Sequence, residues 1–86
     1  MREAYAGRVP RITLIGKPGC HLCEQAEELL EDAGGDYDLR VTAVDITGDP
    51  ATFERYRYDI PVIVVAGGGT VSGRIDAAAL RRALGS

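Results

Sequence analysis

The residues of this chain best suited to covalent chemistry are its two cysteines, Cys20 and Cys23, which are separated by two residues. Residues three positions apart on a helix lie roughly 5–6 Å apart, and a disulfide bond needs Cα atoms roughly 4.4–6.8 Å apart. A structural zinc site needs four ligands, but the chain has no second cysteine pair, and its one histidine, His21, stands between the cysteines. The spacing therefore favours thiol–disulfide chemistry over a mononuclear zinc site, and we expect no bound metal.

The surrounding segment predicts that the cysteines lie where a strand ends and a helix begins. Residues 11–15 form a β-branched run that ends at Gly16, a Pro18-Gly19 turn follows, and apolar residues then recur at helical spacing. The first N–H groups of a helix lack intrahelical partners, and the macrodipole adds partial positive charge there. Both effects favour a thiolate, which is the nucleophilic form of cysteine. We therefore expect Cys20 to be exposed and to attack, and Cys23, on the apolar helix face, to be shielded and to act as the resolving thiol.

Two basic side chains lie beside the pair. Lys17 is the only lysine of the chain and lies three residues before Cys20, where a cation could stabilise the thiolate or attract an anionic substrate. It could equally be an isolated surface charge of little effect. His21 would help the thiolate when protonated, or it would simply point into solvent.

Hydrophobic period and turn residues predict the elements that hold this site. They are, in chain order, a strand over 11–15, a helix from Cys20 to Ala33 ended by Gly34-Gly35, a strand from Leu39 towards Ile46, a short helix from Asp49-Pro50 to near Tyr58, strands over 62–65 and 70–72 joined by Gly67-Gly68-Gly69, and a last helix from Ala77 to Leu84 capped by Asp76. The first crossover makes strands one and two parallel, and the glycine turn makes the last two strands an antiparallel hairpin. The fold class is therefore α/β, a four-stranded mixed sheet with helices on its faces.

Length and charge limit the class of protein further. The 86 residues suffice for a single domain over 1–86, in which residues 1–10 form a short N-terminal extension. The net charge is −3 and the ten basic residues are scattered, which argues against nucleic-acid and anionic-membrane partners. The sequence contains neither a signal-peptide run nor the roughly 20 apolar residues of a membrane span. We predict a cytoplasmic monomer, and because a reducing cytosol does not keep structural disulfides, this location favours a redox role for the cysteines.

Three motifs together are similar to those of a known family. Lys17-Pro18-Gly19-Cys20-His21-Leu22-Cys23-Glu24, Ile60-Pro61-Val62 and Gly73-Arg74-Ile75-Asp76 resemble the glutaredoxin-like family of the thioredoxin superfamily, and more narrowly the small bacterial glutaredoxin-like proteins with a Cys-His-Leu-Cys centre. The resemblance covers residues 11–84. It implies a thioredoxin fold with strand order 2-1-3-4 and about three helices, Cys20 as nucleophile, Cys23 as resolving thiol, and a cis Ile60–Pro61 bond beside Cys20.

The resemblance also implies a substrate site around the cysteines, formed by Lys17, His21, Leu22, Ile60, Pro61, Gly73 and Arg74. In this family the residue before the cis-proline offers its backbone N–H and C=O to a peptide or to glutathione, as an added strand would. The N–H groups around Gly73 and Arg74 would hold one glutathione carboxylate, and Lys17 would hold the other.

The chain departs from ordinary dithiol glutaredoxins in this substrate site. His21 and Leu22 replace a proline and an aromatic residue, Asp59-Ile60 replaces Thr-Val, Ser72-Gly73 replaces a glycine pair, and Ile75 replaces a carboxylate. We expect redox chemistry to be kept and glutathione binding to be weak.

The function that follows is a thiol–disulfide oxidoreductase acting on disulfide-containing proteins or small thiol substrates. It would have no bound cofactor, would use glutathione or another low-molecular-weight thiol as co-substrate, and would draw electrons from an unidentified reductase. The alternative is a non-enzymatic iron–sulfur carrier, in which Cys20 from two subunits and two external thiols hold a [2Fe–2S] cluster. Cluster-binding relatives usually have a single active-site cysteine, so Cys23 counts against this alternative.

Overall fold

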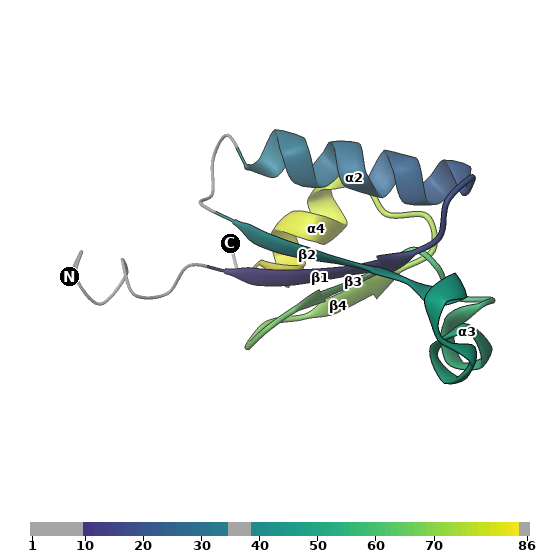
Figure 1. Cartoon of the computed structure of the whole chain (residues 1–86). Coiled ribbons are helices and arrows are strands. Elements are labelled where there is room, and N and C mark those ends of the chain that lie inside the picture. Colours follow the sequence, from purple (N-terminus) through teal and green to yellow (C-terminus); the bar gives the residue numbers. More distant parts are fainter. Residues whose placement is uncertain (1–9, 35–38, 85–86) are drawn as a thin grey trace.

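A computed structural model describes residues 10–34 and 39–84, and it arranges them as one sheet with helices on both sides (Figure 1). The elements are β1 (Arg11–Gly16), α2 (His21–Ala33), β2 (Arg40–Asp45), the 3₁₀ turn η1 (Ile46–Gly48), α3 (Pro50–Tyr56), β3 (Val62–Val65), β4 (Thr70–Ser72) and α4 (Ala77–Ala83). The strand order is β2-β1-β3-β4. β1 pairs parallel with β2, and β3 pairs antiparallel with both β1 and β4. The predicted thioredoxin-like α/β fold, with its order 2-1-3-4, is confirmed.

The core consists of two clusters, one on each face of the sheet. The larger lies under α2 and α4, which cover the same face in Figure 1, and it contains Ile12, Leu14, Ala26, Leu30, Ile63, Val65, Leu80 and Ala83. The smaller contains Ile15, Ile46 and Val62, with α3 residues packed against it. β3 contributes to both clusters, because alternate side chains of a strand point to opposite faces. The apolar run over 62–65 is therefore that of a central strand covered on both faces.

Aspartate residues cap the N-termini of the short helices, and the sequence predicts two of these caps, Asp49 and Asp76. The carboxylate of Asp49 accepts hydrogen bonds from the Thr52 N–H (3.0 Å) and hydroxyl (2.7 Å), and that of Asp76 accepts from the Ala79 N–H (2.8 Å). The Thr52 hydroxyl, and then its N–H, hold the pKa of Asp49 below its ordinary value near 3.8. The bonds from the Thr52 and Ala79 N–H groups are N-cap bonds, which satisfy otherwise free donors of a first helical turn.

The second strand and the second helix end earlier than predicted. The second strand ends at Asp45, and Ile46 belongs to η1, because the Asp45 carboxylate accepts from the Thr47 N–H (2.9 Å) and hydroxyl (2.6 Å) and turns the chain there. The helix predicted to end near Tyr58 ends at Tyr56. The helix stop predicted at Gly34-Gly35 is found at Gly34, which is the right-handed C-cap of α2, while Gly35 lies outside the described residues.

β2 is an edge strand, and it is more exposed than its alternating pattern predicts. Val41 is 46 % exposed, because β2 borders β1 on one side only.

Within the two described ranges, no helix is both long enough and apolar enough to cross a membrane.

Candidate redox site

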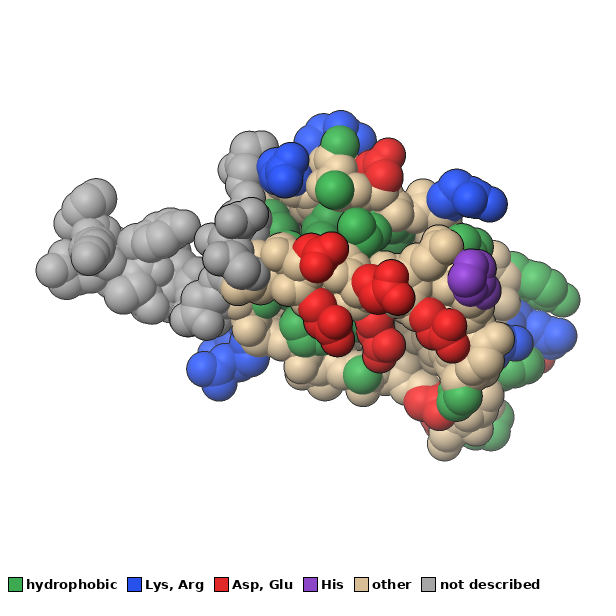
Figure 2. Space-filling model, turned by 90° about the horizontal axis from the view of Figure 1, so that it is seen from above, with side chains coloured by type: hydrophobic (Ala, Val, Ile, Leu, Met, Phe, Trp, Pro, Cys, Tyr) green, Lys and Arg blue, Asp and Glu red, His purple; other side chains and the backbone are tan. Residues whose placement is uncertain are grey.

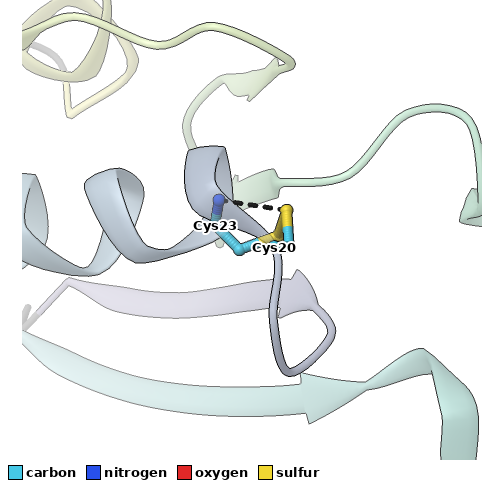
Figure 3. The surroundings of a disulfide bond; sticks show 2 residues. All are labelled: Cys20 and Cys23. Carbon is cyan, nitrogen blue, oxygen red and sulfur yellow. Dashed lines mark hydrogen bonds between the residues drawn. A yellow bond between two sulfur atoms is a disulfide. The ribbon is translucent and has the colours of Figure 1, made fainter.

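Cys20 is the N-cap residue of α2, so its sulfur lies at the positive end of that helix. Its backbone is extended (φ −95°, ψ 113°), and the preceding turn requires Gly19 at φ 77°. The Cys20 Sγ accepts a hydrogen bond from the Cys23 N–H at 3.2 Å (Figure 3). Sulfur here takes the place of the oxygen of a usual N-cap residue. A thiolate at this position is favoured by that N–H and by the helix dipole.

Cys23 lies one turn further along α2, and the two cysteines form a disulfide with Cα atoms 5.1 Å apart (Figure 3). The predicted spacing of the pair is thus observed. Cys23 is 7 % exposed, whereas Cys20 is half-buried rather than fully exposed. Cys20 is therefore the more accessible of the two residues, in the order that the sequence predicts.

The sheet register brings two distant segments to the same end of the molecule as the disulfide. Val62 pairs with Ile15 and with Ser72. Ile60-Pro61 and Gly73-Arg74 therefore lie at the end of the sheet where β1 ends and α2 begins. The Ile60–Pro61 bond is cis, as the resemblance implies. The structure thus gathers the substrate-site residues predicted from three separate motifs at one end of the sheet.

Two of the backbone N–H groups expected to receive a substrate in this region already donate hydrogen bonds within the chain. The Ile60 N–H donates to the Tyr56 carbonyl at 3.2 Å, and the Gly73 N–H donates to the Pro61 carbonyl at 2.9 Å. The expected exposure of the Ile60 N–H is therefore wrong for this conformation, and the Gly73 N–H is engaged within the chain. The first donor completes the turn after α3, and the second ties the end of β4 to the start of β3. The roles of the Ile60 carbonyl and the Arg74 N–H stay predictions.

The side chains predicted around the cysteines differ in exposure. Lys17, His21 and Arg74 are exposed, Leu22 is half-buried, and Pro61 is buried. The His21 Nε2 lies 3.1 Å from the Gln25 Nε2 in an exposed hydrogen bond one turn along the helix. Of the two interpretations of His21, the structure therefore favours the solvent-facing one.

A groove of about 490 Å³ lies on the β2 side of the disulfide, and sequence reasoning missed it. It lies between α2 and the sheet edge, and it is lined by Leu14, Gly16, Lys17, Pro18, Gly19, Cys23, Glu24, Glu27, Ala43, Val44 and Asp45. Lys17 is the one member of the predicted substrate-binding set in this lining. The signal that could have pointed to the groove is the parallel β1–β2 pairing, which places the carboxyl end of β2 beside the first turns of α2.

The outward face of α2 is acidic. Figure 2 shows a group of carboxylates over this helix, whose exposed acidic residues are Glu24, Glu27, Glu28, Glu31 and Asp32. The face agrees with a solvated helix surface opposite the buried Cys23, Ala26 and Leu30.

Comparison with known proteins identifies the family. The model of the glutaredoxin-like domain (DUF836) matches residues 11–85. The X-ray structure of Northeast Structural Genomics target protein XcR50 from X. campestris is 33% identical in sequence, with a TM-score of 0.70, over 81% of this chain and 89% of that one. The redox-type cysteine pair, the thioredoxin-like sheet and the family match agree, and the chain belongs to the glutaredoxin-like family.

Proposed function

We propose that this protein is a thiol–disulfide oxidoreductase in which Cys20 is the nucleophile and Cys23 the resolving thiol. The observation that carries the proposal is the environment of Cys20, whose sulfur caps α2 and accepts the Cys23 N–H. The same helix buries Cys23 within disulfide reach. Membership of the glutaredoxin-like family supports it.

The reaction proceeds in two exchanges. The Cys20 thiolate attacks one sulfur of a substrate disulfide, RS–SR′, so that a Cys20–SR bond forms and R′S⁻ leaves. The Cys23 thiolate then attacks the Cys20 sulfur and releases RS⁻, which leaves the Cys20–Cys23 disulfide. The substrate gains two electrons and the protein loses two. The two protons from the protein thiols end on the released thiols. Two equivalents of a low-molecular-weight thiol, or one of a dithiol, reverse the change in the protein.

We propose a protein disulfide or a small mixed disulfide as substrate, with Lys17 and Arg74 as the exposed cations that attract its carboxylates. The internal hydrogen bonds of the Ile60 and Gly73 N–H groups remove two backbone contacts that a glutathione site would use. A substrate recognised mainly through its disulfide and its charge fits these observations better than one held by many backbone contacts.

The direct test is reduction of insulin disulfides in the presence of dithiothreitol, followed by turbidity. We expect the wild-type protein to accelerate the reaction over dithiothreitol alone and the Cys20→Ser variant to lose that acceleration. The Cys23→Ser variant should accumulate a mixed disulfide on Cys20, visible as a mass increase that excess dithiothreitol removes. Absence of any acceleration by the wild type would contradict the proposal. Visible iron–sulfur absorbance in the purified protein would favour the carrier alternative.

A further inference from the structure

We infer that Gly16 is a positioning residue for the resolving thiol, because its missing side chain provides the space in which the Cys23 sulfur lies. The inference rests on the proposed function, since it assigns the control of the second exchange to a residue outside the Cys20–Cys23 motif. Gly16 is the last residue of β1 and precedes the turn that leads to α2, so the chain returns over it at the first helical turn (Figure 1).

The contact between these two residues is very close. A Cβ added at Gly16 would lie 2.9 Å from the Cys23 Sγ and 3.3 Å from the Cys23 Cβ, whereas ordinary contacts begin at 3.4 Å. Gly16 is not among the described glycines with a left-handed φ, which are Gly19, Gly67 and Gly73. The absence of a side chain at Gly16 is therefore explained by space and not by backbone conformation.

The Cys23 sulfur cannot easily move away from such a Cβ. A cysteine side chain has one rotatable bond to its sulfur, and the Cys23 side chain is buried at 7 % exposure. Rotation about that bond would carry the sulfur away from Cys20, and a shift of the whole residue would lift α2 from the Leu14 and Ala26 core. Either response moves the resolving sulfur relative to its target.

The second exchange is an intramolecular displacement, so its rate and equilibrium depend on how well the Cys23 sulfur is placed against Cys20. A misplacement of about 1 Å can cost an oriented reaction on the order of a hundred-fold. The first exchange should be affected less, because rotation of the Cys23 side chain leaves in place the Cys23 N–H that donates to the Cys20 sulfur. A substitution at Gly16 should therefore slow the second exchange more than the first.

The test compares Gly16→Ala with a matched control, Gly48→Ala, in the full chain. Gly48 has no neighbour within 4 Å of an added Cβ, and its φ is not positive. The Cys20–Cys23 equilibrium is measured in thiol–disulfide buffers of dithiothreitol, and the reactivity of reduced Cys20 is measured by alkylation with iodoacetamide. For Gly16→Ala we expect the disulfide-formation constant to fall at least about ten-fold, which is a rise of about 30 mV in reduction potential. We expect Cys20 alkylation to stay within about two-fold, and Gly48→Ala to match the wild type in both.

A double-variant comparison covers the case in which Gly16→Ala folds poorly. An alanine in a strand is ordinarily more stable than a glycine, so a loss of stability must come from the contact. Thermal unfolding of the reduced proteins should show that Gly16→Ala lowers the Tm in the wild-type background and lowers it less in a Cys23→Ala background, which lacks the sulfur. An unchanged disulfide equilibrium in Gly16→Ala, or an equal Tm loss in both backgrounds, would overturn the inference. Neither measurement uses a substrate, so a wild type with a normal Cys20–Cys23 equilibrium that fails to reduce insulin would contradict the proposed function alone.

Discussion

At the scale of single residues, the two sulfurs have the same chemistry and different surroundings. Cys20 is half-buried at the helix N-cap, and Cys23 is buried one turn away. We predict that alkylation of the reduced protein at neutral pH modifies Cys20 first, because the helix N-terminus and the nearby Lys17 favour its thiolate. Mass mapping after brief iodoacetamide treatment checks this, and preferential labelling of Cys23 would reverse the assigned roles. Lys17→Gln should slow labelling of Cys20 modestly, since one exposed charge has a small effect.

The positions of the two cysteines at the start of α2 could be predicted from the sequence because they depend on local features. A Pro18-Gly19 turn, a helical period and a three-residue spacing all lie within one short segment. The engaged N–H groups of Ile60 and Gly73 could not be predicted in this way. The Ile60 N–H depends on how the turn after α3 closes on Tyr56, and the Gly73 N–H depends on the Pro61 carbonyl, which only the pairing of β3 and β4 brings near it. The closeness of Gly16 to the Cys23 sulfur likewise requires the helix to be placed on the strand.

At the scale of elements, the hydrogen bonds of the Asp45 and Asp49 caps predict a loss of stability in acid at the α3 end of the molecule. The pKa of Asp49 is lowered first by the Thr52 hydroxyl and then by the Thr52 N–H, and Thr47 acts on Asp45 in the same way. A carboxyl whose pKa is lower in the folded chain stabilises the fold above the ordinary value near 3.8, and this contribution is lost as the pH falls through the lowered pKa. We predict that Thr52→Val raises the pKa of Asp49 towards that value and leaves Asp45 unchanged, while Thr47→Val does the converse. Carboxyl titration by NMR checks both variants, and no change at Asp49 in Thr52→Val would contradict the assigned cause.

The type and approximate position of each helix and strand could be predicted from hydrophobic periodicity and turn residues. The 3₁₀ turn η1 and the exposure of β2 could not be predicted in this way. The strand pattern of 39–43 indicates which side chains share a face, but it carries no information on whether that face is covered. Coverage depends on the place of the strand in the sheet, and β2 lies at its edge beside β1 alone. The early turn at Ile46 depends on the Asp45–Thr47 hydrogen bonds, which compete with continuation of the strand.

At the scale of the whole molecule, glutathione recognition depends on segments that only the fold brings together. We predict that glutathione-coupled reduction of a small mixed disulfide is roughly ten- to a hundred-fold less efficient than with an ordinary dithiol glutaredoxin. Losing one charge-assisted hydrogen bond costs on the order of 1.5–3 kcal/mol, and the Gly73 N–H already donates to Pro61. Parallel assays at equal glutathione concentration measure this difference. Comparable turnover in both would show that the altered residues around Leu22 and Ile75 do not limit glutathione use.

The strand order and the gathering of three motifs at one end of the sheet could be predicted at this scale, in part through resemblance to a family. The groove beside Cys23 could not, because its two walls, α2 and β2, are separated in sequence and meet only through the sheet. A pattern along the chain identifies which residues are apolar, and the space left between elements depends on their packing.

The short span of the Cys20–Cys23 bond has a consequence for how redox cycling and folding are coupled. The bond joins residues only three positions apart, so the ring it closes removes little conformational freedom from the unfolded chain. The loop-entropy relation gives about 2 kcal/mol for so short a ring, against about 4.7 kcal/mol for a loop of roughly 100 residues. Making or breaking the bond is therefore expected to change the free energy of unfolding by about 2 kcal/mol, which is less than half of the effect of a long loop but still a sizeable part of the roughly 5–15 kcal/mol of an ordinary domain. In the proposed redox cycle, the oxidised chain would be the more stable form by this amount, and the two apolar clusters would hold the fold in both states.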